Sequence, residues 1–172
     1  EWKILKYLAK CFDVWYTLTV KVYLGGEVLD YNRINEYLVD IFNRVQVIEE
    51  TSLRTSQFND VSLKEMHTIE IIGKNSNVTP SDIARELMLT LGTITTSLNK
   101  LEAKGYIERR RSKLDRRVVH LTLTKKGRLL DRLHHKFHKN MVIHIAEDMN
   151  EEEFEALAQG LKNLHKFLEE LM

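Results

Sequence analysis

The chain has 172 residues, 43% of them hydrophobic, which is enough to build the core of one or two small domains. Its 26 basic and 25 acidic residues nearly cancel, so the total charge alone indicates no nucleic-acid partner. The single cysteine, Cys11, excludes a disulfide framework and fits a reducing cytoplasm, and no apolar run reaches membrane-spanning length, so we expect no membrane segment.

The charges are segregated along the chain. Residues 61–127 hold thirteen Lys/Arg against seven Asp/Glu, whereas residues 147–172 hold two against eight. One region can therefore meet phosphates while another repels them. This distribution, unlike the total, favours a nucleic-acid-binding region in the middle of the chain.

Residues 1–28 mix aromatic, β-branched and lysine side chains. A helix on a membrane surface would explain lysines between apolar residues, but the β-rich second half argues against it. The run Gly25-Gly26-Glu27 can be encoded by purines that resemble a ribosome-binding site, and Leu29 by codons that bacteria use for initiation. We therefore expect residues 1–28 to be an N-terminal extension that is not part of the native protein.

Two predicted helices near the ends of the chain carry seams of apolar residues. Residues 30–55 predict a long helix whose apolar residues recur at intervals of 4 and 3: Ile34, Leu38, Ile41, Val45 and Ile48. Asn150 and Glu153 make a capping signature for a last helix, whose seam is Phe154, Leu157, Leu161, Leu164, Leu168 and Leu171. Packing within one chain would also explain either helix alone. Two such seams favour helix exchange between two subunits, so residues 29–60 and 124–172 are predicted to form a helical dimerisation region.

A helix-turn-helix pattern lies in residues 79–105. Thr79 is a capping residue, and Pro80 suits the first position of the helix that follows. A second helix ends at Gly105, as a left-handed cap would end it, and its apolar face consists of Ile94, Leu98 and Leu101.

The opposite face of that second helix presents small hydroxyls, a glycine, an amide and a lysine. Such a face can enter a major groove without clashing and still hydrogen-bond base edges. Asn99 can pair with adenine and threonine methyls can contact thymine, so we expect an A·T-containing inverted repeat as the operator. The candidate DNA-binding residues of this helix are Gly92, Thr93, Thr95, Thr96, Asn99 and Lys100.

After Gly105 the apolar period changes and predicts two strands, over residues 106–111 and 118–123. Residues 104–117 hold seven Lys/Arg and two acids. Such a run is usually only a solvated face, but directly after a recognition-type helix it indicates a DNA-contacting wing. Asp115 is expected to orient a nearby arginine. The candidate DNA-binding residues of the wing are Arg109, Arg111, Lys113, Arg116 and Arg117.

Together these elements predict a mainly α fold with a small β-wing (α+β), namely a winged helix-turn-helix over residues 61–123 with an α-helical dimerisation platform. A helix from Lys125 to about Met149, capped by Thr124, would bridge the wing and the platform. We expect a homodimer bound to double-stranded DNA, because a two-fold dimer can place its two recognition helices in successive major grooves. We expect no enzyme, since phosphate-loop and nucleophile motifs are missing, and a pure interaction module would leave the wing arginines without a purpose.

The order of these elements and three motifs resemble the MarR family of bacterial transcription regulators. The motifs are LNKLEAKGYI (98–107), DRR (115–117) and LTLTKKG (121–127). From Asp30 onward the chain is similar to the branch that represses fatty-acid biosynthesis genes in Gram-positive bacteria, through DYNRINEYL (30–38) and LGTITTSL (91–98). The resemblance implies a repressor that needs no cofactor and takes long-chain acyl groups on acyl carrier protein as corepressors. Leu29 also stands where the first methionine of that family would be.

An acyl corepressor, as the resemblance implies, needs an apolar tunnel between the platform and the DNA-binding unit. Ordinary core packing is the alternative for every residue that we place there. Because the carrier protein is acidic, it is expected to dock on a basic surface, with Arg128, Arg132 or Lys136 as candidates. The candidate lining residues are Val45, Ile48, Met66, Ile69, Leu133 and Phe137.

Histidines supply an alternative effector site. His134 and His138, at i and i+4, could bind zinc on one helix face, with His67 as a third ligand. MarR-like zinc sensors use histidines in similar places, but here no cysteine follows the first helix and Leu133 stands where a carboxylate would help. We therefore expect structural histidines and no bound metal, with a zinc-responsive regulator as the alternative.

Overall fold

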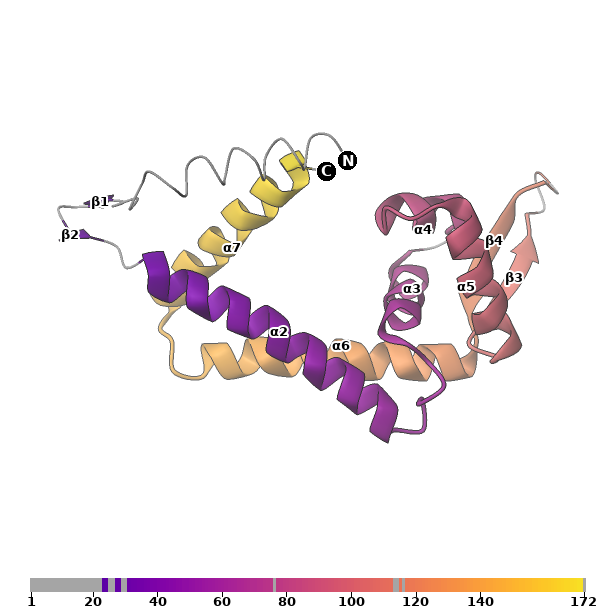
Figure 1. The fold of residues 1–172 in the computed structure, drawn as a ribbon, viewed down its shortest axis with the longest axis horizontal. Helices are drawn as coiled ribbons and strands as arrows, with labels where there is room; N and C mark the ends of the chain where they lie inside the picture. Colours follow the sequence, from indigo (N-terminus) through magenta and orange to yellow (C-terminus); the bar gives the residue numbers. More distant parts are fainter. Residues whose placement is uncertain are drawn as a thin grey trace. The chain divides into compact units, whose positions relative to one another are not determined.

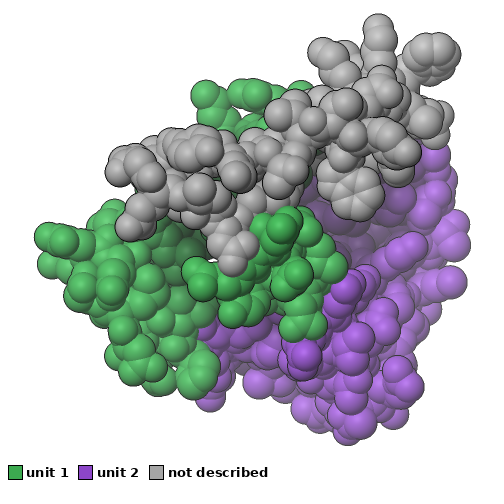
Figure 2. All heavy atoms as spheres, turned by 60° about the vertical axis from the view of Figure 1, so that its left-hand side comes forward, with its two compact units in different colours: residues 1–42, 142–172 green, residues 43–141 purple. Residues whose placement is uncertain are grey.

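The computed structural model describes residues 23–24, 27–28, 31–75, 77–112, 115 and 117–171. The chain divides into two compact units (Figure 2): unit 1 comprises Glu1–Phe42 and Val142–Met172, and unit 2 comprises Asn43–Met141. The predicted N-terminal extension, residues 1–28, lies mostly outside the described residues. Among the helices of the described part, none is long and apolar enough to cross a membrane.

Unit 1 contains a short hairpin and helices from both ends of the chain. The strands β1 (Tyr23–Leu24) and β2 (Glu27–Val28) pair antiparallel. They precede the first part of α2 (Tyr31–Thr55), and the unit ends with the last turn of α6 (Lys125–Ala146) and with α7 (Glu151–Leu171). The long helix predicted over residues 30–55 and the C-terminal helix are both present.

Helix α7 begins as the capping signature predicts. The side-chain oxygen of Asn150 accepts from the backbone N–H of Glu153 at 3.0 Å, and the Glu153 carboxylate accepts from the backbone N–H of Asn150 at 2.9 Å. These bonds satisfy donors that the first turn leaves free, and the acidic residues there oppose the positive end of the helix dipole. No described residue of α7 is fully buried, and Phe154, Leu161 and Leu168 of its apolar seam are 37%, 53% and 46% exposed within one chain.

Unit 2 holds the winged helix-turn-helix (Figure 1). Unit 2 begins with the second part of α2, and its further helices are α3 (Leu63–Lys74), α4 (Pro80–Glu86) and α5 (Leu91–Ala103). It also contains α6 as far as Met141. The strands β3 (Ile107–Arg111) and β4 (Val119–Leu123) form an antiparallel hairpin with Ile107 opposite Leu123. The predicted fold class is confirmed. Helix α6 stops at Ala146, before the predicted end near Met149, because the chain turns there before the Asn150 cap.

Local capping explains where α3, α4 and α5 begin. Ser62 and Glu65 form a reciprocal capping box at α3, and Thr79 and Asp82 form another at α4, where Pro80 occupies the first turn. The Thr90 hydroxyl accepts from the backbone N–H of Thr93 at 3.2 Å and so caps α5. The short-range sequence pattern therefore sets the start of each of these helices.

The core of unit 2 consists of apolar side chains on the sides of these helices and strands that face one another. Buried positions on α3, α4, α5 and the wing pack into a single cluster, which fixes the two helices of the helix-turn-helix against the hairpin. The most deeply buried members are Met66, Ile69, Ile83, Ile94, Leu98, Leu101, Tyr106, Ile107 and Leu121.

Tyr106 joins α5, the wing and α6. Its hydroxyl donates to the Asp60 carboxylate at 2.6 Å, and the Lys126 ammonium lies 4.0 Å from its ring centroid, a cation–π geometry. This hydrogen bond from Tyr106 and the nearby charge of Lys126 hold the pKa of Asp60 below its usual range, although burial opposes them. Burial and the Asp60 carboxylate raise the pKa of the Tyr106 phenol.

Two glycines allow the chain to close around Tyr106. Gly105 has φ of +75°, the left-handed conformation predicted for the end of the recognition-type helix. Its carbonyl accepts from the Thr124 hydroxyl at 2.7 Å, and the same hydroxyl accepts from the Gly127 backbone N–H at 3.1 Å. A Cβ on Gly127 would collide with the carbonyl oxygen of Tyr106, so α6 approaches the wing this closely only with glycine there.

Glu65 connects the start of α3 to the end of α5. Besides its capping bonds, its carboxylate accepts from the Lys104 ammonium at 2.8 and 3.0 Å, and both side chains are shielded from solvent, with exposures of 9% and 28%. Burial favours a higher pKa for Glu65, but the hydrogen bonds and charge of Lys104, together with Ser62, outweigh it and lower the pKa. The folded state therefore holds Glu65 ionised.

We expect Lys104→Met to destabilise the protein by about 1–3 kcal/mol at neutral pH, because it leaves a shielded carboxylate without its cation. Because the pKa of Glu65 is lower in the folded state, its ionisation stabilises the fold at every pH above its unfolded-state pKa. This stabilisation is lost as the pH falls through the folded-state pKa. The difference between Lys104→Met and the parent should therefore shrink on acidification into the glutamate range. Urea unfolding at several pH values measures it.

The matched control for this prediction is Lys166→Met on α7. Lys166 pairs with Glu170 at 4.0 Å, with exposures of 77% and 67%, so its loss should change the free energy of unfolding by less than about 0.5 kcal/mol. Equal effects of the two substitutions would show that the Glu65–Lys104 pair contributes no more than a surface pair.

Candidate nucleic-acid interface

The exposed face of α5 carries every residue that the sequence assigned to base reading. Ile94, Leu98 and Leu101 point into the core, which leaves the other side of the helix to solvent. The exposed positions include Gly92, Thr93, Thr95, Thr96, Asn99 and Lys100. One helix therefore presents a continuous polar surface of the size that fits a major groove.

Hydrogen bonds within α5 orient the threonines. The Thr95 hydroxyl donates to the Leu91 carbonyl at 2.7 Å, and the Thr96 hydroxyl donates to the Gly92 carbonyl at 3.1 Å. Because each hydroxyl hydrogen is used by the backbone, each oxygen can only accept from a base edge in this rotamer. The methyl groups remain free for apolar contact, which suits the thymine methyl.

Arg109 of the wing connects to this face. Its guanidinium donates to the Asn99 side-chain oxygen at 2.8 Å and pairs with Glu102 at 3.0 Å, and its side chain is 30% exposed. The amide nitrogen of Asn99 is thereby turned away from Arg109 and can donate to a base. Sequence reasoning placed Arg109 on DNA and missed this pairing, because no sequence signal links a helix residue with a strand residue ten positions later.

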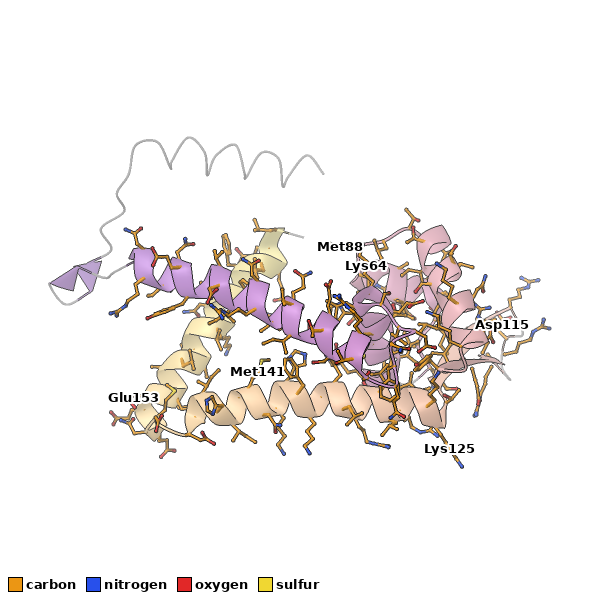
Figure 3. The ribbon with its side chains drawn as sticks, turned by 60° about the horizontal axis from the view of Figure 1, so that its bottom comes forward. Lys64, Met88, Asp115, Lys125, Met141 and Glu153 are labelled. Atoms are coloured by element: carbon orange, nitrogen blue, oxygen red, sulfur yellow. The ribbon has the colours of Figure 1, made fainter. Side chains whose placement is uncertain are left out.

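The tip of the wing is shaped by Asp115 (Figure 3). Its carboxylate accepts from the backbone N–H of Arg117 at 2.9 Å, and its own N–H donates to the Ser112 hydroxyl at 3.4 Å. Asp115 therefore orients the turn through the backbone of the arginine. Arg111 and Arg117 are exposed, while the predicted contacts Lys113 and Arg116 lie outside the described residues.

The turn between α4 and α5 places Met88 in a left-handed conformation with φ of +51°. Its side chain, labelled in Figure 3, is 62% exposed. The turn is closed by the Leu89 N–H, which donates to the Ala84 carbonyl at 2.9 Å. This positive φ was missed from the sequence, because glycine rather than methionine is the usual residue for it.

A cavity of about 500 Å³ lies within unit 2, between α2, α3 and α6. Of the predicted effector residues, Met66, Leu133 and Phe137 line it, whereas Val45, Ile48 and Ile69 do not. Ile69 is fully buried in the core. The remaining lining residues, which sequence reasoning did not assign to an acyl cavity, are Glu49, Ser52, Leu53, Ser56, Gln57, Phe58, Leu63, Leu130 and His134.

Comparison with known proteins agrees with this geometry. Residues 61–119 match the MarR family. Streptococcus pneumoniae FabT, solved in complex with DNA, is 64% identical, with a TM-score of 0.77, over 83% of this chain and 100% of that chain. S. aureus MepR, solved as a DNA complex, is 25% identical with a TM-score of 0.62, over 79% and 94%. The HTH-type transcriptional regulator YwhA of Bacillus subtilis (strain 168) is 43% identical over 60 residues, which are 35% of this chain and 43% of that protein.

We expect Gly92→Ala to lower DNA affinity while preserving or raising stability. Alanine favours a helix by about 1 kcal/mol over glycine. A Cβ at Gly92 would meet only the Thr90 hydroxyl, at 3.9 Å, so the added methyl causes no strain and projects into the space that DNA would occupy. Thermal unfolding and operator affinity, measured on the same preparation, test both parts.

Gly160→Ala is the matched control, since Gly160 lies in α7 outside its apolar seam and a Cβ there meets nothing within 4 Å. It should gain stability without any change in DNA affinity. Operator binding by Gly92→Ala as tight as that of the parent would mean that the glycine is merely tolerated.

Proposed function

The chain belongs to the MarR family of transcription regulators, and on that premise we propose that it represses fatty-acid biosynthesis genes as a DNA-binding homodimer, with long-chain acyl-acyl carrier protein as corepressor. The exposed polar face of α5 beside the basic wing is the observation that carries DNA binding. The 64% identity to FabT, together with the resemblance in segments 30–38 and 91–98, supports fatty-acid control.

The proposed binding mode places α5 in the major groove of an inverted-repeat operator. Asn99 and the threonines read base edges, Gly92 allows close approach to the backbone, and Lys100 neutralises phosphate. The wing reaches the adjacent minor groove through Arg111 and Arg117, with Lys113 and Arg116 assigned the same role from the sequence. That FabT and MepR were both solved with DNA supports this mode.

The homodimer is supported by the apolar surface of unit 1. In the seam of α2, Ile34 and Ile41 are each 54% exposed, and in that of α7, Leu161 and Leu168 are 53% and 46% exposed. Monomeric proteins in water rarely expose so many large apolar side chains on neighbouring turns. A second copy would cover them through the two apolar seams, and its two-fold axis would match an inverted repeat.

The cavity in unit 2 is the proposed site of the acyl chain. Its volume of about 500 Å³ lies within the range of small-molecule sites, and its walls are mostly apolar, including Leu63, Met66 and Phe137. Met66 belongs to α3, which packs in the same core as the helix-turn-helix. An occupant can therefore interact differently with two states of the DNA-binding unit, as coupling to DNA affinity requires.

The surface beside the cavity suits an acidic carrier protein. The candidate docking residues Arg128, Arg132 and Lys136 are all exposed on α6. Leu133 and Phe137, which line the cavity, directly follow Arg132 and Lys136 in the chain. A carrier held by these cations would thus present its acyl group next to the cavity.

Titration of long-chain acyl carrier protein into a mixture of repressor and operator DNA tests the proposal. We expect operator affinity to rise by ~5–150-fold, the usual span of allosteric coupling, and the unacylated carrier to have no such effect. Tightening by both forms, or by neither, would contradict an acyl corepressor.

A pair of tryptophan variants locates the acyl site. Leu133→Trp should fill the cavity and abolish the response to acyl carrier while operator binding alone is unchanged. Leu129→Trp is the control, since Leu129 is also partly exposed on α6, at 37%, but is not among the cavity-lining residues. A full response from Leu133→Trp would place the acyl chain elsewhere.

A further inference from the structure

Three potential metal ligands from two helices meet at one point in unit 2. Glu49 Oε1 of α2 lies 2.9 Å from His134 Nε2 and 3.1 Å from His138 Nε2 of α6, and the two nitrogens are 3.1 Å apart. The three donor atoms thus form a nearly equilateral triangle. A tetrahedral zinc ion with bonds of about 2.0–2.1 Å separates its ligand atoms by roughly 3.3–3.4 Å, so a movement of a few tenths of an ångström would seat the ion.

The triangle has a closed side and an open side. Glu49 and His134 are buried, with exposures of 8% each, whereas the His138 side chain is 41% exposed. The two imidazoles are one helical turn apart, with rings at 88° and centroids 4.5 Å apart. An ion can therefore enter past His138, and the same opening leaves room for a water or another small ligand at a fourth position.

A further carboxylate stands behind His134, where it would orient the imidazole. His134 Nδ1 is buried without a hydrogen bond, and Glu70 Oε2 of α3 lies 3.7 Å from it. Glu70 is in turn held by Lys74 at 2.7 Å. A carboxylate near the far nitrogen of a ligating histidine fixes its tautomer and raises its basicity, which is the usual arrangement around a bound metal.

We propose that Glu49, His134 and His138 form a binding site for a divalent transition-metal ion of the Zn²⁺ class. Two imidazoles and one carboxylate with a single open position suit zinc, whereas Mg²⁺ and Ca²⁺ take mostly oxygen ligands in larger shells. The site differs from the sequence-based alternative, because Glu49 replaces His67 as the third ligand. The rings of His67 and His134 are 6.1 Å apart, and His67 is not in the group whose donor atoms lie within 4.8 Å of one another.

The bound ion would bridge α2 and α6 beside the cavity, since Glu49 and His134 also line that cavity. This proposal does not depend on the acyl corepressor. Metal binding is measured directly, so the failure of either proposal can be recognised without the other.

Competition with a chromophoric zinc chelator, using the full chain, tests the site. We expect one Zn²⁺ per chain, and Co²⁺ should give the intense visible absorption of a tetrahedral site. Glu49→Gln and His138→Ala should each weaken Zn²⁺ binding more than about tenfold, and Glu70→Gln should weaken it by ~10–100-fold, as loss of an outer partner does. Circular dichroism establishes that each variant is folded, and the exposure of His138 makes its replacement mild.

His135→Ala is the matched control, because His135 is exposed on the same helix and interacts with Asp131 instead of with the triangle. It should bind Zn²⁺ as the parent does. Failure of the parent to bind Zn²⁺, or unchanged binding by folded Glu49→Gln and His138→Ala, would overturn the proposal. Loss of binding in His67→Ala with retention in Glu49→Gln would also overturn it, in favour of an all-histidine site.

Discussion

Tyr106 is the residue through which the recognition helix, the wing and α6 hold one another in place. The ring is fully buried, its hydroxyl is fixed by Asp60, and Lys126 covers its face. The chain enters this position through the left-handed Gly105, and Gly127 brings α6 against the Tyr106 carbonyl. Because these contacts join the three elements at one point, a displacement of α6 would move the helix and the wing together. Under the proposed function, an effector bound against α6 would change DNA affinity through this point without unfolding the reading surface.

The reading surface is itself pre-arranged by bonds inside the chain. Arg109 ties the wing to the recognition helix through Asn99, and the hydroxyls of Thr95 and Thr96 are engaged by the backbone of α5. Side chains held in this way lose less conformational entropy on binding, which favours both affinity and discrimination between bases. The apolar seams of α2 and α7, in contrast, are only partly covered within one chain, and Ile34, Ile41, Leu161 and Leu168 remain about half exposed.

Most of the fold could be predicted from the sequence, because its determinants are local. Capping pairs three residues apart, such as Ser62 with Glu65, set the helix starts, and Gly105 marks the change from helix to strand. The polar face of α5 and the wing residues could be predicted from the sequence, but the cavity and the metal-ligand cluster in unit 2 could be predicted only in part. Tertiary contacts bring their other residues together. Glu49 and His134 are 85 residues apart in the chain, and no periodicity connects them. Val45 and Ile48 share the seam of α2, but neither lines the cavity that Glu49 lines. Val45 is one helical turn before Glu49, and Ile48 is 47% exposed.

Recognition of one operator by two copies of the chain is tested most directly by changing the spacing of the half-sites. The affinity of the full chain is measured for the inverted repeat and for the same DNA with about five extra base pairs, half a helical turn, between the half-sites. A two-fold dimer with α5 in successive major grooves predicts a fall towards non-specific affinity, by ~10³-fold or more, because the insertion turns one half-site to the opposite face of the duplex. Equal affinity for both DNAs would contradict it.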